Sequence, residues 1–292
     1  MKSLIPKTAV IGAESFIGAR MLAEYRKIYP TCVGSTRRDA SDKSSYLDLA
    51  DPDIAALRLV ETGHKAALIS AGITDVRYCQ AHREFSRTIN VDGILRLYHR
   101  LCDQDILPIF LSSDYVFDGA DDKNYSEDDD TSPICEYGLQ KALVEKEISN
   151  GSRPHLILRL SKIFGTQVGD GTFLTQAFES LSAGQSIYAA SDLIFNPIFI
   201  EDVVKVITGL QISMLKGLYN VCSTEAWSRF ELMLKLAERF GFDKRLVKKA
   251  VLDDLVELRL PKNISMNCQK LVDAIDCKFT SMDDCIGRIE SQ

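Results

Sequence analysis

The sequence predicts an α/β fold in which helices cover both faces of a parallel sheet, and three observations lead to this prediction. Short apolar runs alternate with amphipathic segments about every 25 to 35 residues, which is the rhythm of βαβ units. The apolar runs are nearly continuous, as expected of strands buried on both faces. With 292 residues, 46% hydrophobic and 26% charged, the chain suits one large domain or two smaller ones.

The first part of the chain supplies the regular alternation. We expect helices at 16–28, 53–63 and 84–104, and another that starts near Tyr137. Strands are expected at 8–13, 31–38, 65–73, 107–113 and 155–165, with a short strand or loop at 46–51.

The alternation weakens after about residue 165. Residues 169–184 and 228–241 have helical patterns, whereas 196–210 and 217–223 resemble returns to the main sheet. We therefore predict a sheet domain of residues 1–165 with 195–222 and a smaller, discontinuous C-terminal lobe of residues 166–194 with 223–292. The acidic segment 118–133 is expected to be a solvated or mobile loop rather than a metal site.

Composition excludes several classes of function. A net charge of −6 argues against a nucleic-acid binder, which would need a basic surface. No run of eighteen apolar residues and no secretory signal is present, so we expect a cytoplasmic protein without a membrane partner. The eight cysteines form no C-x-x-C pair, and we expect reduced thiols and no metal.

The stretch "AVIGAESFIGARM" places Gly12 and Gly18 across the first strand-to-helix junction. Gly12 allows a tight turn, Gly18 allows close packing of helix on strand, and the helix N-terminus offers free N–H groups to a pyrophosphate. Two glycines also suit an ordinary turn, but their position favours a Rossmann-type, doubly wound dinucleotide-binding sheet. Ser15, Phe16 and Ile17 complete this predicted contact, with Ser15 where glycine is usual.

Arg37 and Arg38 follow the second predicted strand, where an acidic residue would bind the adenosine ribose and arginine complements a 2′-phosphate. NADP is therefore the predicted cofactor, with NADPH favoured over NADH. The alternative is a pair of solvated arginines in a loop. The remaining cofactor candidates lie along the same scaffold: Asp48, Leu49, Ala71 and Gly72.

The strand "LPIFLSS" ends in Ser113, and "EYGLQK" places Tyr137 and Lys141 four residues apart on one helix face. A nearby ammonium lowers the pKa of a tyrosine, so Lys141 is expected to lower that of Tyr137. Ser113 would bind the substrate oxygen while hydride moves. A lone Y-x-x-x-K motif is common on surface helices; the serine and the glycine turn favour catalysis by all three residues, with Tyr137 and Lys141 also contacting the cofactor.

These motifs resemble those of the extended short-chain dehydrogenases/reductases. "FLSSDYVFDG" followed by "EDDDTSPICEYGLQK" is similar to the dTDP-4-dehydrorhamnose reductase branch, as are "INVDGI", "LRLSKIFG", "NPIFIEDVVKVI" and "RLPKNISMN". The resemblance covers essentially the whole chain, with departures at Ser15, at Lys162 and at Leu260, which is inserted between Arg259 and Pro261. By matching, it implies substrate contacts at Thr74, Val76, Ser113, Asp114, Asn196 and Arg259.

The resemblance implies an NADPH-dependent reductase of a nucleotide-linked 4-keto-6-deoxysugar, with a homodimer as the expected assembly. Two alternatives stay open. One is a non-catalytic, NADP-binding regulatory subunit similar to the β subunit of methionine adenosyltransferase, which also carries a D-Y-V-F-D-G segment. The other is a sugar-nucleotide epimerase or dehydratase; dehydratases need an acid–base pair after the serine, and Asp114 supplies half of it.

Overall fold

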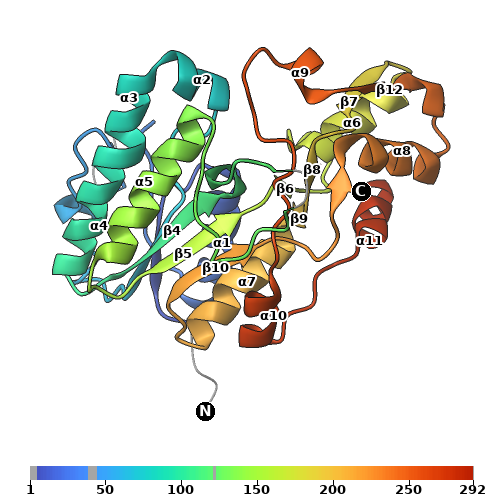
Figure 1. The fold of residues 1–292 in the computed structure, drawn as a ribbon. Coiled ribbons are helices and arrows are strands. Elements are labelled where there is room, and N and C mark those ends of the chain that lie inside the picture. Colours follow the sequence, from blue (N-terminus) through green and yellow to red (C-terminus); the bar gives the residue numbers. More distant parts are fainter. Residues whose placement is uncertain (1–4, 39–44, 121–122, 292) are drawn as a thin grey trace. The chain divides into compact units, whose positions relative to one another are not determined.

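The computed structural model describes residues 5–38, 45–120 and 123–291, which form two compact units (Figure 1). The first unit comprises residues 1–116, 135–159 and 204–219, and the second comprises residues 117–134, 160–203 and 220–292. These units differ from the predicted division chiefly at 117–134, 160–165 and 195–203, which group with the second unit.

A six-stranded sheet forms the centre of the first unit, and it confirms the predicted Rossmann-type architecture. The strand order is β10-β5-β4-β3-β1-β2, and the registers of β1 with β2, of β1 with β3 and of β3 with β4 are parallel. The strands are β1 Thr8–Ile11, β2 Gly34–Ser35, β3 Ala66–Ile69, β4 Leu107–Ser113, β5 Leu156–Leu160 and β10 Gly217–Val221. The order reverses at β1, so the carboxyl ends of β1 and β3 border the crevice in which such sheets bind ligands.

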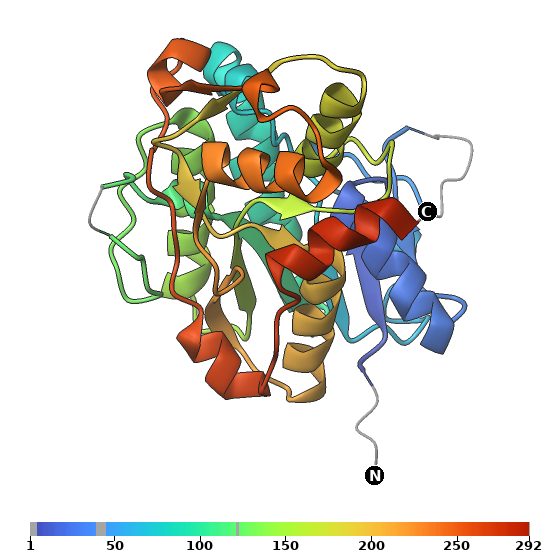
Figure 2. The same cartoon turned by 90° about the vertical axis from the view of Figure 1, so that its right-hand side faces the viewer.

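Helices cover both faces of this sheet. One face carries α1 (Phe16–Ile28) and α7 (Ile200–Ile212), which Figure 2 views from their own side. The hydroxyl of Tyr25 on α1 donates to Oε1 of Gln211 on α7 at 2.7 Å, and this bond is buried. The other face carries α2 (Val76–Ala81), α3 (Arg83–Arg87), the π-helical segment η2 (Thr88–Gly93), α4 (Ile94–Asp103) and α5 (Glu136–Asn150).

The hydrophobic core between α4 and the sheet is formed by apolar residues that recur at helical spacing along the sequence. Ile94, Leu97 and Leu101 recur at helical spacing on α4 and are buried against Ile69 and Phe110 of the sheet. Each fully buried side chain of this size stabilises the fold by about 1.5–3 kcal/mol relative to an exposed one.

Several predicted elements differ in length or kind. Residues 53–63 form only the short 3₁₀ turn η1 (Ala55–Leu57), because Arg58 has a left-handed backbone with φ +48° that ends the helical path. The predicted strand 31–38 is reduced to β2. Residues 46–51 form a loop that meets the chain at Thr36 through a single parallel bridge.

The second unit contains three two-stranded sheets. β6 (Ile163–Phe164) pairs with β9 (Ile198–Phe199), β7 (Ile187–Ala190) with β12 (Val247–Ala250), and β8 (Ile194–Phe195) with β11 (Trp227–Ser228). The predicted strand 155–165 therefore splits into β5 and β6. Of the predicted return 196–210, the short strand β9 pairs with β6 and the residues from Ile200 onward form α7, so this segment does not join the main sheet. The predicted return 217–223 contains β10, which does belong to the main sheet. The helices are α6 Phe173–Ser182, α8 Arg229–Phe240, α9 Leu252–Leu255, α10 Gln269–Ile275 and α11 Met282–Gly287, with 3₁₀ turns η4 Lys244–Leu246 and η5 Arg288–Ser291.

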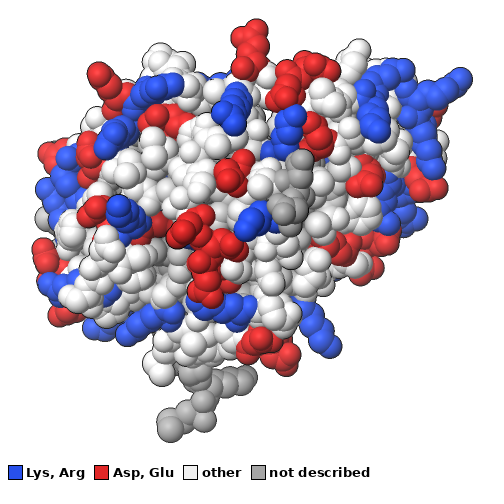
Figure 3. All heavy atoms as spheres, in the orientation of Figure 1, with Lys and Arg blue, Asp and Glu red and all other residues white. Residues whose placement is uncertain are grey.

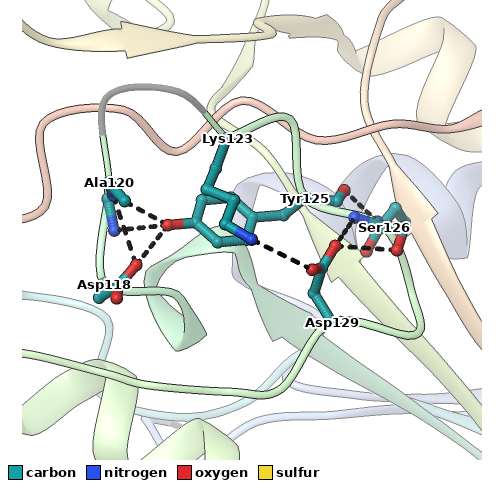
Figure 4. A network of polar contacts seen from close by, with 8 residues as sticks. Asp118, Ala120, Lys123, Tyr125, Ser126 and Asp129 are labelled. Atoms are coloured by element: carbon teal, nitrogen blue, oxygen red, sulfur yellow. Dashed lines mark hydrogen bonds and ion pairs between the residues drawn. The ribbon is translucent and has the colours of Figure 1, made fainter.

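The acidic segment is anchored within the second unit (Figure 4). The hydroxyl of Tyr125 donates to Asp118 and accepts from the amide of Ala120 at 2.9 Å, while Asp129 accepts from the amide of Ser126 at 2.8 Å. Tyr125 is buried and its ring stacks on that of Phe117 with centroids 4.1 Å apart. The described part of this segment is therefore held by side chains, although several of its carboxylates face solvent.

Acidic and basic side chains are interspersed over the face that Figure 3 shows. In residues 5–38, 45–120 and 123–291, no helix combines the length and apolar character that a membrane span requires.

Candidate functional site

The glycine turn after β1 has the backbone geometry that its sequence predicts. Gly12 has φ +92°, and a Cβ added there would lie 2.6 Å from the backbone nitrogen of Ala71. A Cβ on Gly18 would lie 2.2 Å from the carbonyl oxygen of Gly12. Both positions thus require glycine, since real Cβ atoms do not approach backbone so closely.

Ser15 is the N-cap of α1 and accounts for the departure from glycine. Its hydroxyl accepts from the amide of Gly18 at 3.0 Å and donates to the carbonyl of Gly12 at 2.9 Å. The cap thus uses one of the N–H groups that a helix N-terminus leaves without helical partners. Phe16 and Ile17 hold the other first-turn amides, which suit an anionic group such as a pyrophosphate.

A cavity of about 270 Å³ lies against this turn in the first unit. Eight of the predicted cofactor residues line it, namely Gly12, Ser15, Arg37, Arg38, Asp48, Leu49, Ala71 and Gly72. Phe16, Ile17 and Gly18 are not among its lining residues; they form the first turn of α1, directly after Ser15. The glycine cradle, the helix N-terminus and the two arginines fit a phosphorylated dinucleotide.

The sequence interpretation missed seven residues that also line the cavity: Glu14, Ser35, Thr36, Leu47, Ser70, Ile73 and Ile89. Ser35 ends β2 and Ser70 directly follows β3, and the hydroxyls of both hold the glycine turn. The Ser35 hydroxyl accepts from the amide of Gly12 at 3.2 Å, and that of Ser70 donates to its carbonyl at 3.0 Å. Their positions at the carboxyl ends of two strands could have indicated from the sequence that they lie at the cofactor site.

Charged groups of both signs stand at one edge of the cavity. Nε of Arg38 lies 3.3 Å from Oε2 of Glu14, and both side chains reach solvent. Asp48 accepts from the amide of Ala50 at 2.9 Å, which fixes its carboxylate on the adjoining loop.

Ser113, Tyr137 and Lys141 come together in the first unit. Ser113 ends β4, and Tyr137 and Lys141 occupy successive turns of α5, whose first turn faces the 3₁₀ segment η3 (Asp114–Val116). All three side chains are buried. The Ser113 hydroxyl donates to Oδ1 of Asp114 at 2.9 Å and accepts from the amide of Tyr115 at 3.3 Å.

The electrostatics of Tyr137 differ from the expectation. Burial raises the pKa of Tyr137 above its usual value, Asp114 raises it further, and the Ser113 hydroxyl lowers it. The Lys141 ammonium donates to the carbonyl of Leu111 at 2.7 Å and lies 5.8 Å from the Tyr137 ring centre, and it does not offset the effect of burial on the pKa of Tyr137. Tyr137 therefore remains a protonated phenol, the form that can donate a proton.

Burial also lowers the pKa of Lys141 to about 8, opposed by the carboxylate of Glu145 one turn further along α5. Glu145 is itself paired with Arg159 of β5 through a contact of 2.8 Å, and both side chains are buried. Glu145, the acidic member of this buried ion pair, therefore lies one helical turn after Lys141 on the same helix.

A buried polar network, which the sequence interpretation did not identify, fixes α5 against the wall of the cavity. Gln140 donates to Ser86 at 2.7 Å and accepts from the Asn90 amide at 2.8 Å. Asn90 in turn accepts from the amide of Ile73 at 2.7 Å and donates to its carbonyl at 2.8 Å. Because Ile73 lines the cavity, this network connects α5, the helix of Tyr137, to the wall of the cavity.

The predicted substrate residues are divided between the two units. In the first unit, Thr74 is exposed in the loop after β3, Val76 starts α2 behind the N-cap Asp75, and Asp114 is buried beside Ser113. In the second unit, Asn196 is buried and accepts from the amide of Met266 at 2.8 Å, whereas Arg259 is exposed.

Comparisons with known proteins cover the whole chain. The family model described as RmlD substrate binding domain matches residues 7–289. The chain is 26% identical over 290 residues to the probable low-salt glycan biosynthesis reductase of Haloferax volcanii, covering 97% of this chain and 96% of that protein. It is 22% identical to methionine adenosyltransferase 2 subunit beta of Xenopus tropicalis, over 91% of this chain and 81% of that protein.

Among solved structures, the dTDP-4-dehydrorhamnose reductase of Bacillus anthracis in complex with NADP matches with a TM-score of 0.85 at 19% identity. The match covers 98% of this chain and 99% of the other. At this identity the likeness supports the fold.

Proposed function

Since the chain belongs to the family of the RmlD substrate binding domain, we propose that it is an NADPH-dependent reductase of a nucleotide-linked 4-keto-6-deoxysugar. The family match confirms the resemblance that the motifs indicated. The observation that carries the proposal is the meeting of Ser113, Tyr137 and Lys141 on β4 and α5 of the unit that holds the cavity beside the glycine turn.

Each residue has a defined task in this proposal. When bound, the reduced nicotinamide supplies the hydride. Ser113 binds the carbonyl oxygen of the substrate, and Tyr137 donates its phenolic proton to that oxygen as it gains charge. Lys141 supplies positive charge near the cofactor end of the site. Reduction uses the protonated form of the Tyr137 phenol, because the acid must carry its proton when the carbonyl reacts.

The residues toward the cofactor follow the same scheme. The first turn of α1 would hold the pyrophosphate, Asp48 and Leu49 the adenine, and Arg37 and Arg38 the 2′-phosphate. Replacing both arginines by alanine should weaken NADPH much more than NADH in a fluorescence titration. Equal weakening of the two cofactors would contradict the assignment.

Turnover is tested by incubating the protein with NADPH and a panel of nucleotide-linked 4-keto sugars while following the absorbance of the reduced nicotinamide. Tyr137→Phe keeps most of the ring packing and removes the proton, so it should bind NADPH normally and lose turnover on the order of 10²-fold or more. Undiminished turnover in this variant would exclude the assigned role.

One other function is favoured by a specific observation, the 22% identity with the β subunit of methionine adenosyltransferase over 91% of this chain. A regulatory subunit would bind NADPH without consuming it on any member of the panel. In that case the informative measurement is co-purification with a methionine adenosyltransferase catalytic subunit.

A further inference from the structure

We propose that Glu14 is a determinant of cofactor choice that narrows the preference for NADPH over NADH by competing with the 2′-phosphate for Arg38. This inference rests on the proposed use of NADPH. It concerns an acidic residue within the glycine turn itself, rather than the residues after β2 that the sequence indicates.

The geometry places Glu14 and Arg38 at the same edge of the cavity. Glu14 lies in the turn between β1 and α1, Arg38 follows β2, and both line the cavity with Arg37. Nε of Arg38 lies 3.3 Å from Oε2 of Glu14. The amide of Arg38 also donates to the Thr36 hydroxyl at 3.1 Å, which fixes the backbone from which this side chain extends.

The two cofactors differ at this edge by one phosphate group. A 2′-phosphate carries close to two negative charges at neutral pH, and it is bound best at an edge of the planar guanidinium group of an arginine, through paired N–H groups. Because Nε of Arg38 lies 3.3 Å from the Glu14 carboxylate, the edge of the guanidinium that includes Nε is open to the phosphate only if the carboxylate gives way. The carboxylate then remains beside the phosphate as a like charge.

NADH presents only a ribose hydroxyl at the same place, and a hydroxyl can donate to a carboxylate. Glu14 is therefore expected to disfavour NADPH while leaving NADH binding unchanged or slightly favoured. The side chains of Arg38 and Glu14 are 84% and 43% exposed, so solvent screens the interaction and the effect is moderate.

The test is the dissociation constant of each reduced cofactor, measured by fluorescence titration without sugar substrate. Glu14→Gln removes the charge and keeps the shape, and it should tighten NADPH by about threefold to fivefold while changing NADH by less than about twofold. Glu24→Gln is the matched control, because Glu24 lies on α1, pairs with Arg20 at 3.2 Å and does not line the cavity. It should change neither constant.

A second measurement tests the competition for Arg38. In an Arg38→Ala background, Glu14→Gln should improve NADPH affinity by less than it does in the wild-type protein, because the contested group is gone. Equal gains for both cofactors, no gain, or weaker NADPH binding in Glu14→Gln would overturn the proposal. If Glu14→Gln improved NADPH affinity as much in the Arg38→Ala background as in the wild-type protein, Glu14 would not act by competing for Arg38. Since no turnover is measured, these results are separate from the test of the reductase function.

Discussion

The buried ion pair behind Lys141 offers a stability test whose magnitude follows from the structure. Arg159 contacts Glu145 through three N–O distances of 3.2, 3.0 and 2.8 Å, and the two side chains are only 5% and 4% exposed. Removing Arg159 leaves the buried Glu145 carboxylate without its paired guanidinium, although Lys141 one turn away still interacts with it, and breaking such a buried pair costs about 3–5 kcal/mol. Arg159→Leu should therefore lower the free energy of unfolding by about that amount.

The assay is urea unfolding followed by circular dichroism, with two comparison variants. Glu145→Leu combined with Arg159→Leu removes both charges and should recover most of the loss, because an apolar pair avoids the stranded carboxylate. Arg153→Leu disrupts a pair with Asp103 at 3.4 Å that is 53% and 72% exposed, and it should cost less than about 1 kcal/mol. A similar loss in Arg159→Leu and Arg153→Leu, or additive losses in the double variant, would refute the reasoning.

Three further predictions use the same unfolding assay. Gly12→Ala should destabilise the protein by more than 1 kcal/mol and weaken NADPH by roughly tenfold or more in a titration, whereas Gly63→Ala, which has a positive φ but open space around it, should show only the cost of backbone strain. Lys141 has a pKa of about 8 in the folded state against roughly 10.4 when unfolded, so its charge costs stability below pH 8 and this cost disappears as the pH rises past 10.4. The free energy of unfolding of Lys141→Met, relative to that of wild type, should thus be highest near pH 7 and lose this advantage by about pH 10.5. If the difference in unfolding free energy between the two proteins did not depend on pH, the burial of the Lys141 charge would be contradicted. Gln140→Leu should lower the free energy of unfolding by about 1–3 kcal/mol, because two buried polar partners lose their hydrogen bonds. Glu147→Gln, at an exposed position of the same helix, should change it by less than about 0.5 kcal/mol. Equal effects of the two substitutions would show that the network does not stabilise the fold.

The sequence by itself determined the sheet architecture of the first unit and eight of the residues that line its cavity. Strands that are buried on both faces of a sheet can be recognised in the sequence as nearly continuous apolar runs. Gly12 marks the turn at the end of the first strand, because its backbone has a positive φ that other residues rarely adopt. The spacing of Tyr137 and Lys141 likewise fixes their common helix face, because helical geometry relates residues four apart.

Tertiary structure decided the features that depend on distant parts of the chain. Residues 53–63 have a helical pattern yet follow an irregular path, since Ile54, Leu57 and Leu59 pack into the core on either side of a left-handed Arg58. The pKa of Tyr137 is raised rather than lowered, because burial and Asp114 act on it while Leu111 engages Lys141. The pairing of Glu14 with Arg38 and that of Gln140 with Asn90 join residues 24 and 50 positions apart. Local patterns carry no information about such pairs, because each pair forms only once the tertiary structure has brought its two segments together.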